Sequence, residues 1–210
     1  MPGEIEYFYS TRSSFAYLGH AEIVGLARKH GRRLIHRPML LAIVVPGTGG
    51  LPFDRRHPAR LAQAWDDLQR WADFREIPIQ RQDPKHHVGP LELPSGLVVA
   101  AQYEPGLGQD RLDRLAFEIL AALWRDDRDI ADPEVLRELC ANAGLAAEAD
   151  RLLETALAEA AQAEIQNNSQ EAVRRGIIGA PSYAVDGEIY FGQDRLDFVA
   201  RALQAADLRS

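Results

Sequence analysis

Two segments at opposite ends of the chain constrain its fold more than any other feature. Near the start, alternating side chains predict a strand over about residues 4–10, and a helix headed by two serines, Ser13 and Ser14, follows it. Near the end, the β-rich segments 182–185 and 188–191 flank Asp-Gly, a dipeptide typical of a two-residue hairpin. A framework of strands and helices therefore needs both ends of the chain, and what lies between them is an insertion.

The remaining periodicity completes this α/β framework and fills the insertion with helices. Residues 33–38 predict a second strand after the first helix, which ends at Gly31, and a helical crossover of this kind favours parallel pairing. The Gly/Pro-rich run 46–52 favours a loop, and 83–94 a Pro/Gly-marked connector. A last helix begins at about Asp194. Helical spacing is also found over these segments: 59–76, 112–123, 133–143 and 152 towards 175.

Length and charge limit the classes of protein to which the chain can belong. Its 210 residues fit one domain, or one domain with a large insert, and can bury a sizeable core. With 24 Lys and Arg against 31 Asp and Glu, the net charge of -7 argues against nucleic-acid binding. The first residues lack a secretory signal, and no apolar run approaches the roughly 20 residues that span a membrane. We therefore expect a soluble protein with neither nucleic acid nor membrane as a partner.

The residues most often associated with redox and metal chemistry are interpreted as structural. Cys140, the single cysteine, has no disulfide partner, which indicates a reduced, cytoplasmic setting, and its apolar neighbours in sequence predict a core residue. Six histidines include the pair His86-His87, but no His-Glu-x-x-His motif or Cys cluster accompanies them, so we expect no metal site. The sequence leaves open whether His57, His86 or His87 lines a substrate pocket, and whether a tryptophan does so instead of packing in the core.

Three local features suit ligand binding, each with a purely structural alternative. Ser13 and Ser14 stand where a helix begins, so they either cap it or help its free N–H groups to hold an anion or thiolate. Ala180-Pro181 is either a turn or a cis proline facing that helix end, beside backbone that can pair with a peptide-like ligand. Gln193-Asp194 suits either an N-cap or the carboxylate and ammonium groups of a ligand.

The order of these elements is that of a thioredoxin-like fold in which serine stands where the redox-active members keep cysteine. The chain resembles the 2-hydroxychromene-2-carboxylate isomerases, which belong with the kappa-class glutathione transferases and the DsbA-type oxidoreductases. The resemblance covers nearly the whole chain and is most specific in Tyr-Phe-Gly-Gln-Asp-Arg-Leu at 190–196. The following segments carry it: 13–18, 37–41, 67–72 and 179–196.

This resemblance implies an α/β, thioredoxin-like domain formed by residues 1–50 and 174–210, with an all-helical insertion over 51–173, as in DsbA and the kappa-class transferases. It also implies glutathione as the cofactor, bound where the two parts meet. Ser13, by its position before Phe-Ala-Tyr, is implied to donate a hydrogen bond that keeps the glutathione sulfur as thiolate.

The same resemblance assigns the other ligand contacts and shows three departures from the family. Ala180-Pro181 is implied to hold the cysteinyl backbone of glutathione, and Gln193-Asp194 to receive its γ-glutamyl end. Ser14 stands where the family usually has Pro, which leaves open which of the two hydroxyl groups faces the sulfur. Gly50 stands where an asparagine helps to hold glutathione, and Arg60 where a lysine meets the glycyl carboxylate. Gly50 loses a side-chain hydrogen bond, whereas Arg60 keeps the charge as a planar fork.

The implied activity is a glutathione-dependent isomerisation of 2-hydroxychromene-2-carboxylate and trans-o-hydroxybenzylidenepyruvate-type compounds in aromatic degradation. A small aromatic compound is then the substrate, and a homodimer is implied by resemblance alone. Two alternatives stay open: a kappa-like glutathione transferase, and a catalytically inactive thiol- or peptide-binding protein. Disulfide exchange by the chain alone is excluded, because it contains no Cys-x-x-Cys.

Overall fold

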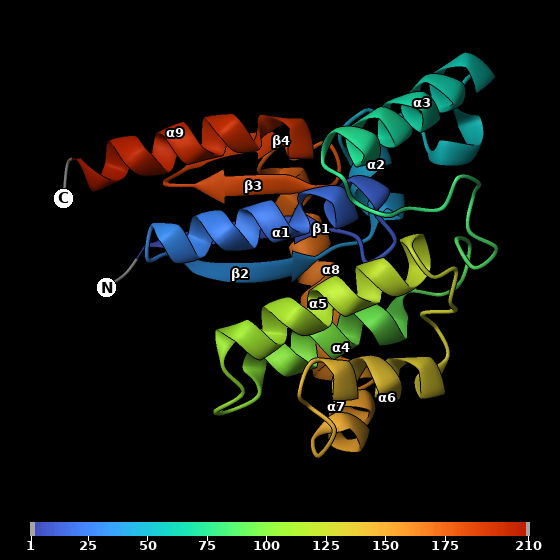
Figure 1. Cartoon of the computed structure of the whole chain (residues 1–210), viewed down its shortest axis with the longest axis vertical. Coiled ribbons are helices and arrows are strands. Elements are labelled where there is room, and N and C mark those ends of the chain that lie inside the picture. The colour runs from blue at the N-terminus through green and yellow to red at the C-terminus, as the bar shows by residue number, and fades with distance from the viewer. Residues whose placement is uncertain (1–2, 209–210) are drawn as a thin grey trace.

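The computed structural model describes residues 3–208, which form a mixed sheet surrounded by helices (Figure 1). The strands are β1 (Glu4–Tyr9), β2 (Arg33–Pro38), β3 (Ser182–Val185) and β4 (Glu188–Phe191). The α-helices are α1 (Ser14–Lys29), α2 (Leu41–Gly47), α3 (Pro58–Phe74), α4 (Glu92–Tyr103), α5 (Gln109–Trp124), α6 (Pro133–Asn142), α7 (Ala149–Ala156), α8 (Glu159–Arg174) and α9 (Leu196–Asp207). The 3₁₀ helices η1 (Phe53–Arg55) and η2 (Gln193–Arg195) precede α3 and α9.

The sheet joins the two ends of the chain, as predicted. Its strand order is β2-β1-β3-β4. β1 runs parallel to β2, with Tyr7 beside His36, and antiparallel to β3, with Phe8 beside Ser182. The hairpin between β3 and β4 turns at Asp186-Gly187, where both residues have positive φ, as a two-residue turn of this type requires. The predicted strands, parallel pair and hairpin are therefore confirmed.

The side chains of β1 alternate between two faces of the sheet, and each face is covered by its own helices. Ile5, Tyr7 and Tyr9 belong to the larger hydrophobic cluster, together with residues of α1, α5 and α9. Phe8 points the other way and belongs to a smaller cluster with residues of α2 and α8. Figure 1 shows α1 and α9 along the near face of the sheet and α8 behind it. The strand's period of two thus produces a layered α/β structure.

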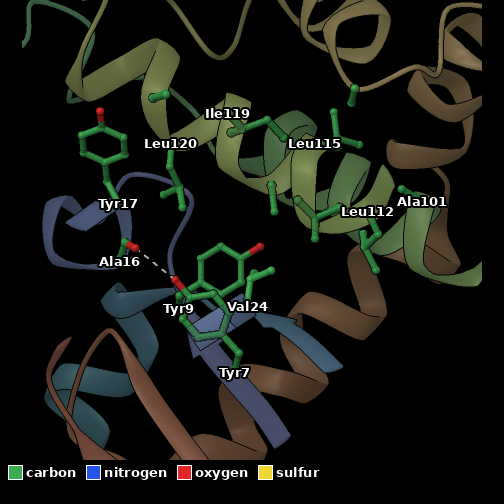
Figure 2. Packing of buried hydrophobic residues seen from close by; sticks show 14 of the residues in the cluster. Tyr7, Tyr9, Ala16, Tyr17, Val24, Ala101, Leu112, Leu115, Ile119 and Leu120 are labelled. Atoms are coloured by element: carbon green, nitrogen blue, oxygen red, sulfur yellow. Dashed lines mark hydrogen bonds between the residues drawn. The ribbon is translucent and has the colours of Figure 1, made fainter. Parts of the chain in front are cut away.

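The larger core joins the sheet to the helices inserted in the middle of the chain. The ring of Tyr7 stacks on Tyr9 with centroids 4.2 Å apart, and its hydroxyl donates to the carbonyl of Ala16 (3.2 Å). Figure 2 shows these rings and α1 facing Leu115 and Ile119 of α5, both of which are fully buried. One continuous cluster therefore runs from β1 through α1 to α5.

The inserted helices lie on two sides of the sheet. Figure 1 shows α3 on the side of β4 and α9, and α4 to α7 on the side of β2. The connector between α3 and α4 crosses from one side to the other. The division into 1–50 with 174–210 and an inserted 51–173 stays a prediction.

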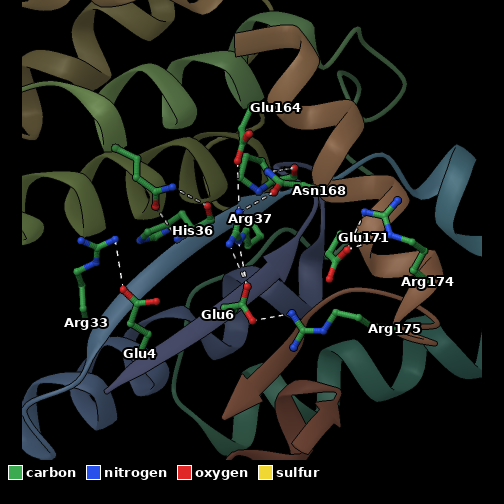
Figure 3. Close-up of polar contacts among 12 residues, drawn as sticks. Glu4, Glu6, Arg33, His36, Arg37, Glu164, Asn168, Glu171, Arg174 and Arg175 are labelled. Atoms are coloured by element: carbon green, nitrogen blue, oxygen red, sulfur yellow. Dashed lines mark hydrogen bonds and ion pairs between the residues drawn. The ribbon is translucent and has the colours of Figure 1, made fainter. Parts of the chain in front are cut away.

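Charged side chains tie α8 to β1 and β2 on the second face of the sheet (Figure 3). Glu6 of β1 pairs with Arg37 of β2 (3.0 Å) and with Arg175 after α8 (2.6 Å). Arg37 also pairs with Glu164 and donates to Asn168 of α8, both at 3.3 Å. Each partly buried charge here has an opposite charge beside it, which offsets its loss of hydration.

A short helix occupies part of the run that its composition assigned to a loop, so that prediction is wrong for Pro46 and Gly47. α2 continues through both residues. Pro46 lies near the helix end, where it removes a single hydrogen bond. Gly47 lies against α8, because a Cβ there would come within 2.8 Å of the Val173 side chain. Burial of Val44 in the smaller cluster stabilises a helix that local composition disfavours.

Helix α4 is not among the helices that the sequence predicted. Its first residue, Glu92, lies inside the predicted connector 83–94, and Pro94 falls in its first turn. Proline is tolerated there because the first N–H groups of a helix have no acceptor within it.

The helix predicted from residue 152 towards 175 is two helices, α7 and α8. They are separated by Leu157 and Ala158, and the backbone of Ala158 is extended with φ -64° and ψ 149°. The carbonyl of Ala156 lies against Gly96 of α4 and accepts a hydrogen bond from Gln162 of α8 (2.6 Å). Contacts with α4 and α8 therefore end α7 at Ala156, although the apolar pattern of the sequence continues beyond it.

The single cysteine lies in the core, as predicted. Cys140 of α6 is fully buried, and this burial raises the pKa of its thiol to about 11. Within residues 3–208, no helix combines the length and the apolar character that crossing a membrane requires.

Candidate active site

Helix α1 begins at the end of β1, and Ser13 is its N-cap. The backbone of Ser13 is extended, its N–H donates to the Ser10 carbonyl (2.9 Å), and its Oγ accepts from the N–H of Ala16 (3.2 Å). Because the capping bond uses an oxygen lone pair, the hydroxyl hydrogen of Ser13 is still available to a ligand. Ser14 is the first helical residue, so its N–H has no acceptor within the helix. The capping interpretation is confirmed, and it is compatible with ligand binding.

Ala180 and Pro181 lie at the same edge of the sheet as the start of α1. Their peptide bond is cis, as predicted. Since Phe8 pairs with Ser182, the residue before Ser182 lies beside the end of β1. The Pro181 carbonyl accepts from the N–H of Gly192 (2.8 Å). Within residues 3–208, no hydrogen bond uses the backbone N–H or carbonyl of Ala180, so both can pair with a ligand.

Gln193 and Asp194 occupy η2, which packs against α1. Gln193 is buried against Gly19, and its side-chain oxygen has no hydrogen-bond partner. Asp194 is exposed and pairs with Arg195 (2.6 Å). The predicted start of the last helix at Asp194 is two residues early, because the 3₁₀ turn comes first and Arg195 is the N-cap of α9. The alternative that Asp194 caps this helix is therefore wrong.

Gly50 and Arg60 are not linked to the other candidates. Gly50 follows α2, where its N–H donates to the Val45 carbonyl (2.8 Å) and an added Cβ would meet that carbonyl at 3.0 Å. The turn leaves little room for the asparagine of the family. Arg60 lies in the first turn of α3 and is exposed. Across residues 3–208, neither residue has a hydrogen bond or ion pair to Ser13, Ser14, Ala180, Pro181, Gln193 or Asp194.

Arg75 is a positioning residue that sequence reasoning missed. It follows α3, donates to the Gln193 carbonyl (3.1 Å) and pairs with Glu22 of α1. Its guanidinium also lies over the ring of Trp71, 5.4 Å from the centroid. Arg75 therefore fixes η2 against α1. No local pattern in the sequence distinguishes it from the other arginines.

A second group, which the sequence did not single out as a unit, contacts Arg12 just before the start of α1. Trp124, at the end of α5, donates from Nε1 to the Arg12 carbonyl (2.8 Å), and Arg12 donates to the carbonyl of Gly89. The ring of His87 meets Trp124 edge-on, with centroids 5.3 Å apart. Burial lowers the pKa of His87; the charge of Asp83 opposes this shift, and that of Arg12 adds a smaller lowering, so the imidazole is neutral at pH 7. Sequence reasoning had left the position of His87 open.

The groups that face the start of α1 are those that a peptide thiolate needs. The Ser13 hydroxyl and the Ser14 N–H are donors at the positive end of a helix dipole. The open backbone of Ala180 can pair with a peptide, whereas the unpaired side-chain oxygen of Gln193 is buried. These residues fit glutathione at its thiol and at the backbone of its cysteinyl residue. In residues 3–208, no group of three or more His, Cys, Asp or Glu side chains could hold a metal ion.

Comparison with known proteins agrees with this fold. A family model for the DSBA-like thioredoxin domain matches residues 4–204. A 2-hydroxychromene-2-carboxylate isomerase of Sphingobium xenophagum is 30% identical over 206 residues, which cover 95% of this chain and 97% of that protein. Glutathione S-transferase kappa 1 of Rattus norvegicus is 25% identical, over 96% of this chain and 91% of that protein.

Two solved structures share the fold along their whole length. A structure of 2-hydroxychromene-2-carboxylate isomerase has a TM-score of 0.74 at 22% identity, covering 98% of this chain and 99% of that chain. The cytosolic disulfide reductase DsbM of Pseudomonas aeruginosa with GSH has a TM-score of 0.71 at 20% identity, covering 99% and 100%. The chain therefore belongs to the DsbA-like thioredoxin family, and its relatives there include an isomerase and a kappa-class glutathione transferase.

Proposed function

We propose that the protein is a glutathione-dependent isomerase acting on 2-hydroxychromene-2-carboxylate and trans-o-hydroxybenzylidenepyruvate-type compounds. The observation that carries the proposal is the arrangement around Ser13, a capping hydroxyl at the start of α1 that can still donate, beside the open backbone of Ala180. The 30% identity to an isomerase over 95% of this chain supports the choice of reaction.

Each residue of the site has a role in this proposal. Bound glutathione supplies a thiol that adds reversibly to a conjugated enone. Ser13 and the helix N-terminus favour the thiolate form and so lower the pKa of that thiol. Ala180 and Pro181 hold the cysteinyl backbone, while Gln193 and Asp194 receive the γ-glutamyl end.

Three candidate residues have subordinate roles. The N–H of Ser14 adds a donor at the helix end. Gly50 contributes no side chain, and Arg60 supplies a positive charge for the glycyl carboxylate. The single buried cysteine and the structural likeness to a cytosolic disulfide reductase support a cytoplasmic location. A homodimer remains part of the proposal on family grounds.

The first test replaces Ser13 by Ala, with Ser14→Ala as the matched control. We expect Ser13→Ala to lower turnover by about 100-fold, because one donor to a developing negative charge is lost. Loss of the cap also lowers the free energy of unfolding by about 1 kcal/mol, which a urea titration would measure. Titration of the thiolate ultraviolet absorbance should show a higher pKa for bound glutathione in Ser13→Ala alone. Full turnover by this variant would rule the proposal out.

A kappa-like transferase is the second candidate, supported by the 25% identity to a kappa-class enzyme. The two activities differ in the fate of glutathione, which an isomerase regenerates and a transferase consumes. Counting free thiol before and after complete conversion of the substrate distinguishes them. Binding of glutathione without turnover of either kind would indicate the third candidate, a catalytically inactive thiol-binding protein.

A further inference from the structure

Arg12 is a partly buried arginine that has no acidic partner within residues 3–208, unlike other partly buried arginines of this chain. Its Nε is buried without a hydrogen-bond partner, and its guanidinium donates to the Gly89 carbonyl. No carboxylate within residues 3–208 lies at ion-pair distance from it, although Glu92 is near enough to affect its pKa. The partly buried Arg37, Arg75 and Arg175 each pair with a glutamate.

An unpaired charge of this kind is costly for the folded protein. Partial burial removes water from the guanidinium, and no carboxylate among residues 3–208 forms an ion pair that would replace that water. Burial accordingly lowers the pKa of Arg12. A carboxylate ligand would supply the missing charge and would match the planar fork of arginine.

Aromatic side chains lie near Arg12: Trp124 bonds to its backbone, and His87 is close enough for the charge of Arg12 to affect its pKa. His87 lies between Trp124 and Phe53, and meets both edge-on, with centroids 5.3 Å and 6.1 Å apart. The indole N–H of Trp124 bonds to the backbone of Arg12, so this row of aromatic rings begins one residue from Ser13. Phe53 is 55% exposed, which leaves the outer part of the row open to solvent.

We propose that Arg12 and an aromatic wall, formed by Phe53 and His87 and backed by the buried ring of Trp124, bind an aromatic carboxylic acid. The carboxylate lies on the guanidinium of Arg12, and the ring of the acid lies against the wall. This inference rests on the proposed function in one respect, because that function makes the bound acid the substrate and this part of the site the substrate pocket. It requires no glutathione, because every group in it belongs to the chain.

Two ligands that differ only in the carboxylate test the proposal by calorimetric titration without glutathione. Benzylidenepyruvate carries a carboxylate, a conjugated enone and a phenyl ring, whereas benzylideneacetone has a methyl group in place of the carboxylate. Arg12→Gln removes the charge but keeps a donor for the Gly89 carbonyl. Arg201→Gln is the matched control, since Arg201 is an exposed arginine of α9 with no ion pair among the described residues.

We expect the wild type to bind the acid more tightly than the ketone. Arg12→Gln should weaken binding of the acid by about 10- to 100-fold and leave that of the ketone unchanged, because only the charged hydrogen bonds are lost. Arg12→Lys should fall between them. His87→Ala should weaken both ligands alike, while His86→Gln, which alters the exposed neighbour, should weaken neither.

Equal binding of the acid by the wild type and by Arg12→Gln would overturn the proposal, as would equal affinity of the wild type for the two ligands. If Arg12→Gln does not fold, Arg12→Lys and the comparison of ligands in the wild type still decide it. Loss of turnover in Ser13→Ala tests the proposed function separately. Selective binding of the acid in a protein that never binds glutathione would retain this inference and remove that function.

Discussion

Gly19 shows at the scale of one residue how closely α1 approaches the segment that carries Gln193. A Cβ at this position would lie 2.8 Å from both the Gln193 Cβ and the Tyr183 hydroxyl. We expect Gly19→Ala to lower the free energy of unfolding by about 1–2 kcal/mol, because overpacking outweighs the gain in helix propensity. Urea unfolding measures this loss, and weaker binding of glutathione should accompany it if η2 moves.

Gly25 of the same helix is the matched control. It is exposed, and a Cβ there would meet nothing within 4 Å. Gly25→Ala should therefore stabilise the protein by about 0.5–1 kcal/mol. If both substitutions stabilise the protein equally, then η2 does not constrain α1.

At the scale of elements, α4 approaches α7 closely at Gly96. A Cβ on Gly96 would come within 2.0 Å of the Ala156 carbonyl, which is backbone and cannot rotate away. We expect Gly96→Ala to destabilise the protein by about 3 kcal/mol, the upper end for overpacking. The loss should appear in urea unfolding, with faster hydrogen exchange in α7 than in α1. Unchanged exchange in α7 would contradict this account.

The elements that the sequence predicted are those with strong local signals. The hairpin at Asp186-Gly187 and the cap at Ser13 depend on residues next to each other in the chain. The errors arose where a contact between residues distant in sequence decides where a helix begins or ends. Examples are the contact of Val173 with Gly47 in α2 and that of Gly96 with the end of α7. Such contacts leave no periodic pattern, so α2 and the break between α7 and α8 could not be predicted.

At the scale of the whole molecule, the candidate site likewise combines residues with local sequence signals and residues brought together only by the fold. The start of α1 and the cis proline were predicted because each has a signature of its own and both lie on the framework. The group around Arg12, His87 and Trp124 was not, because it is assembled from the ends of three distant segments. Single residues of this kind become recognisable only when burial and missing partners are known.

The whole molecule folds around a buried polar group between the sheet and α5. His36 of β2 pairs with the carboxylate of Asp113 (3.0 Å) and with the hydroxyl of Tyr9 (3.1 Å). His20 of α1 bonds to the Asp113 carbonyl (2.9 Å) and is packed by the rings of Tyr7 and His36. Burial, and then the proximity of His36, lower the pKa of His20 from 6.5 to about 4.

This shift makes the stability of the whole fold depend on pH. The unfolded chain binds a proton at His20 below about pH 6.5, while the folded chain does so only near pH 4. The contribution of neutral His20 is therefore complete above about pH 6.5 and is lost as the pH falls to about 4, which amounts to about 3 kcal/mol. Urea midpoints measured over this range should fall more steeply for the wild type than for His20→Phe, which cannot titrate. His20→Phe should start lower at neutral pH, because it gives up the bond to Asp113, and the two curves should converge in acid. The exposed-loop variant His86→Gln should follow the wild type, and parallel curves for the wild type and His20→Phe would show that folding does not lower the pKa of His20.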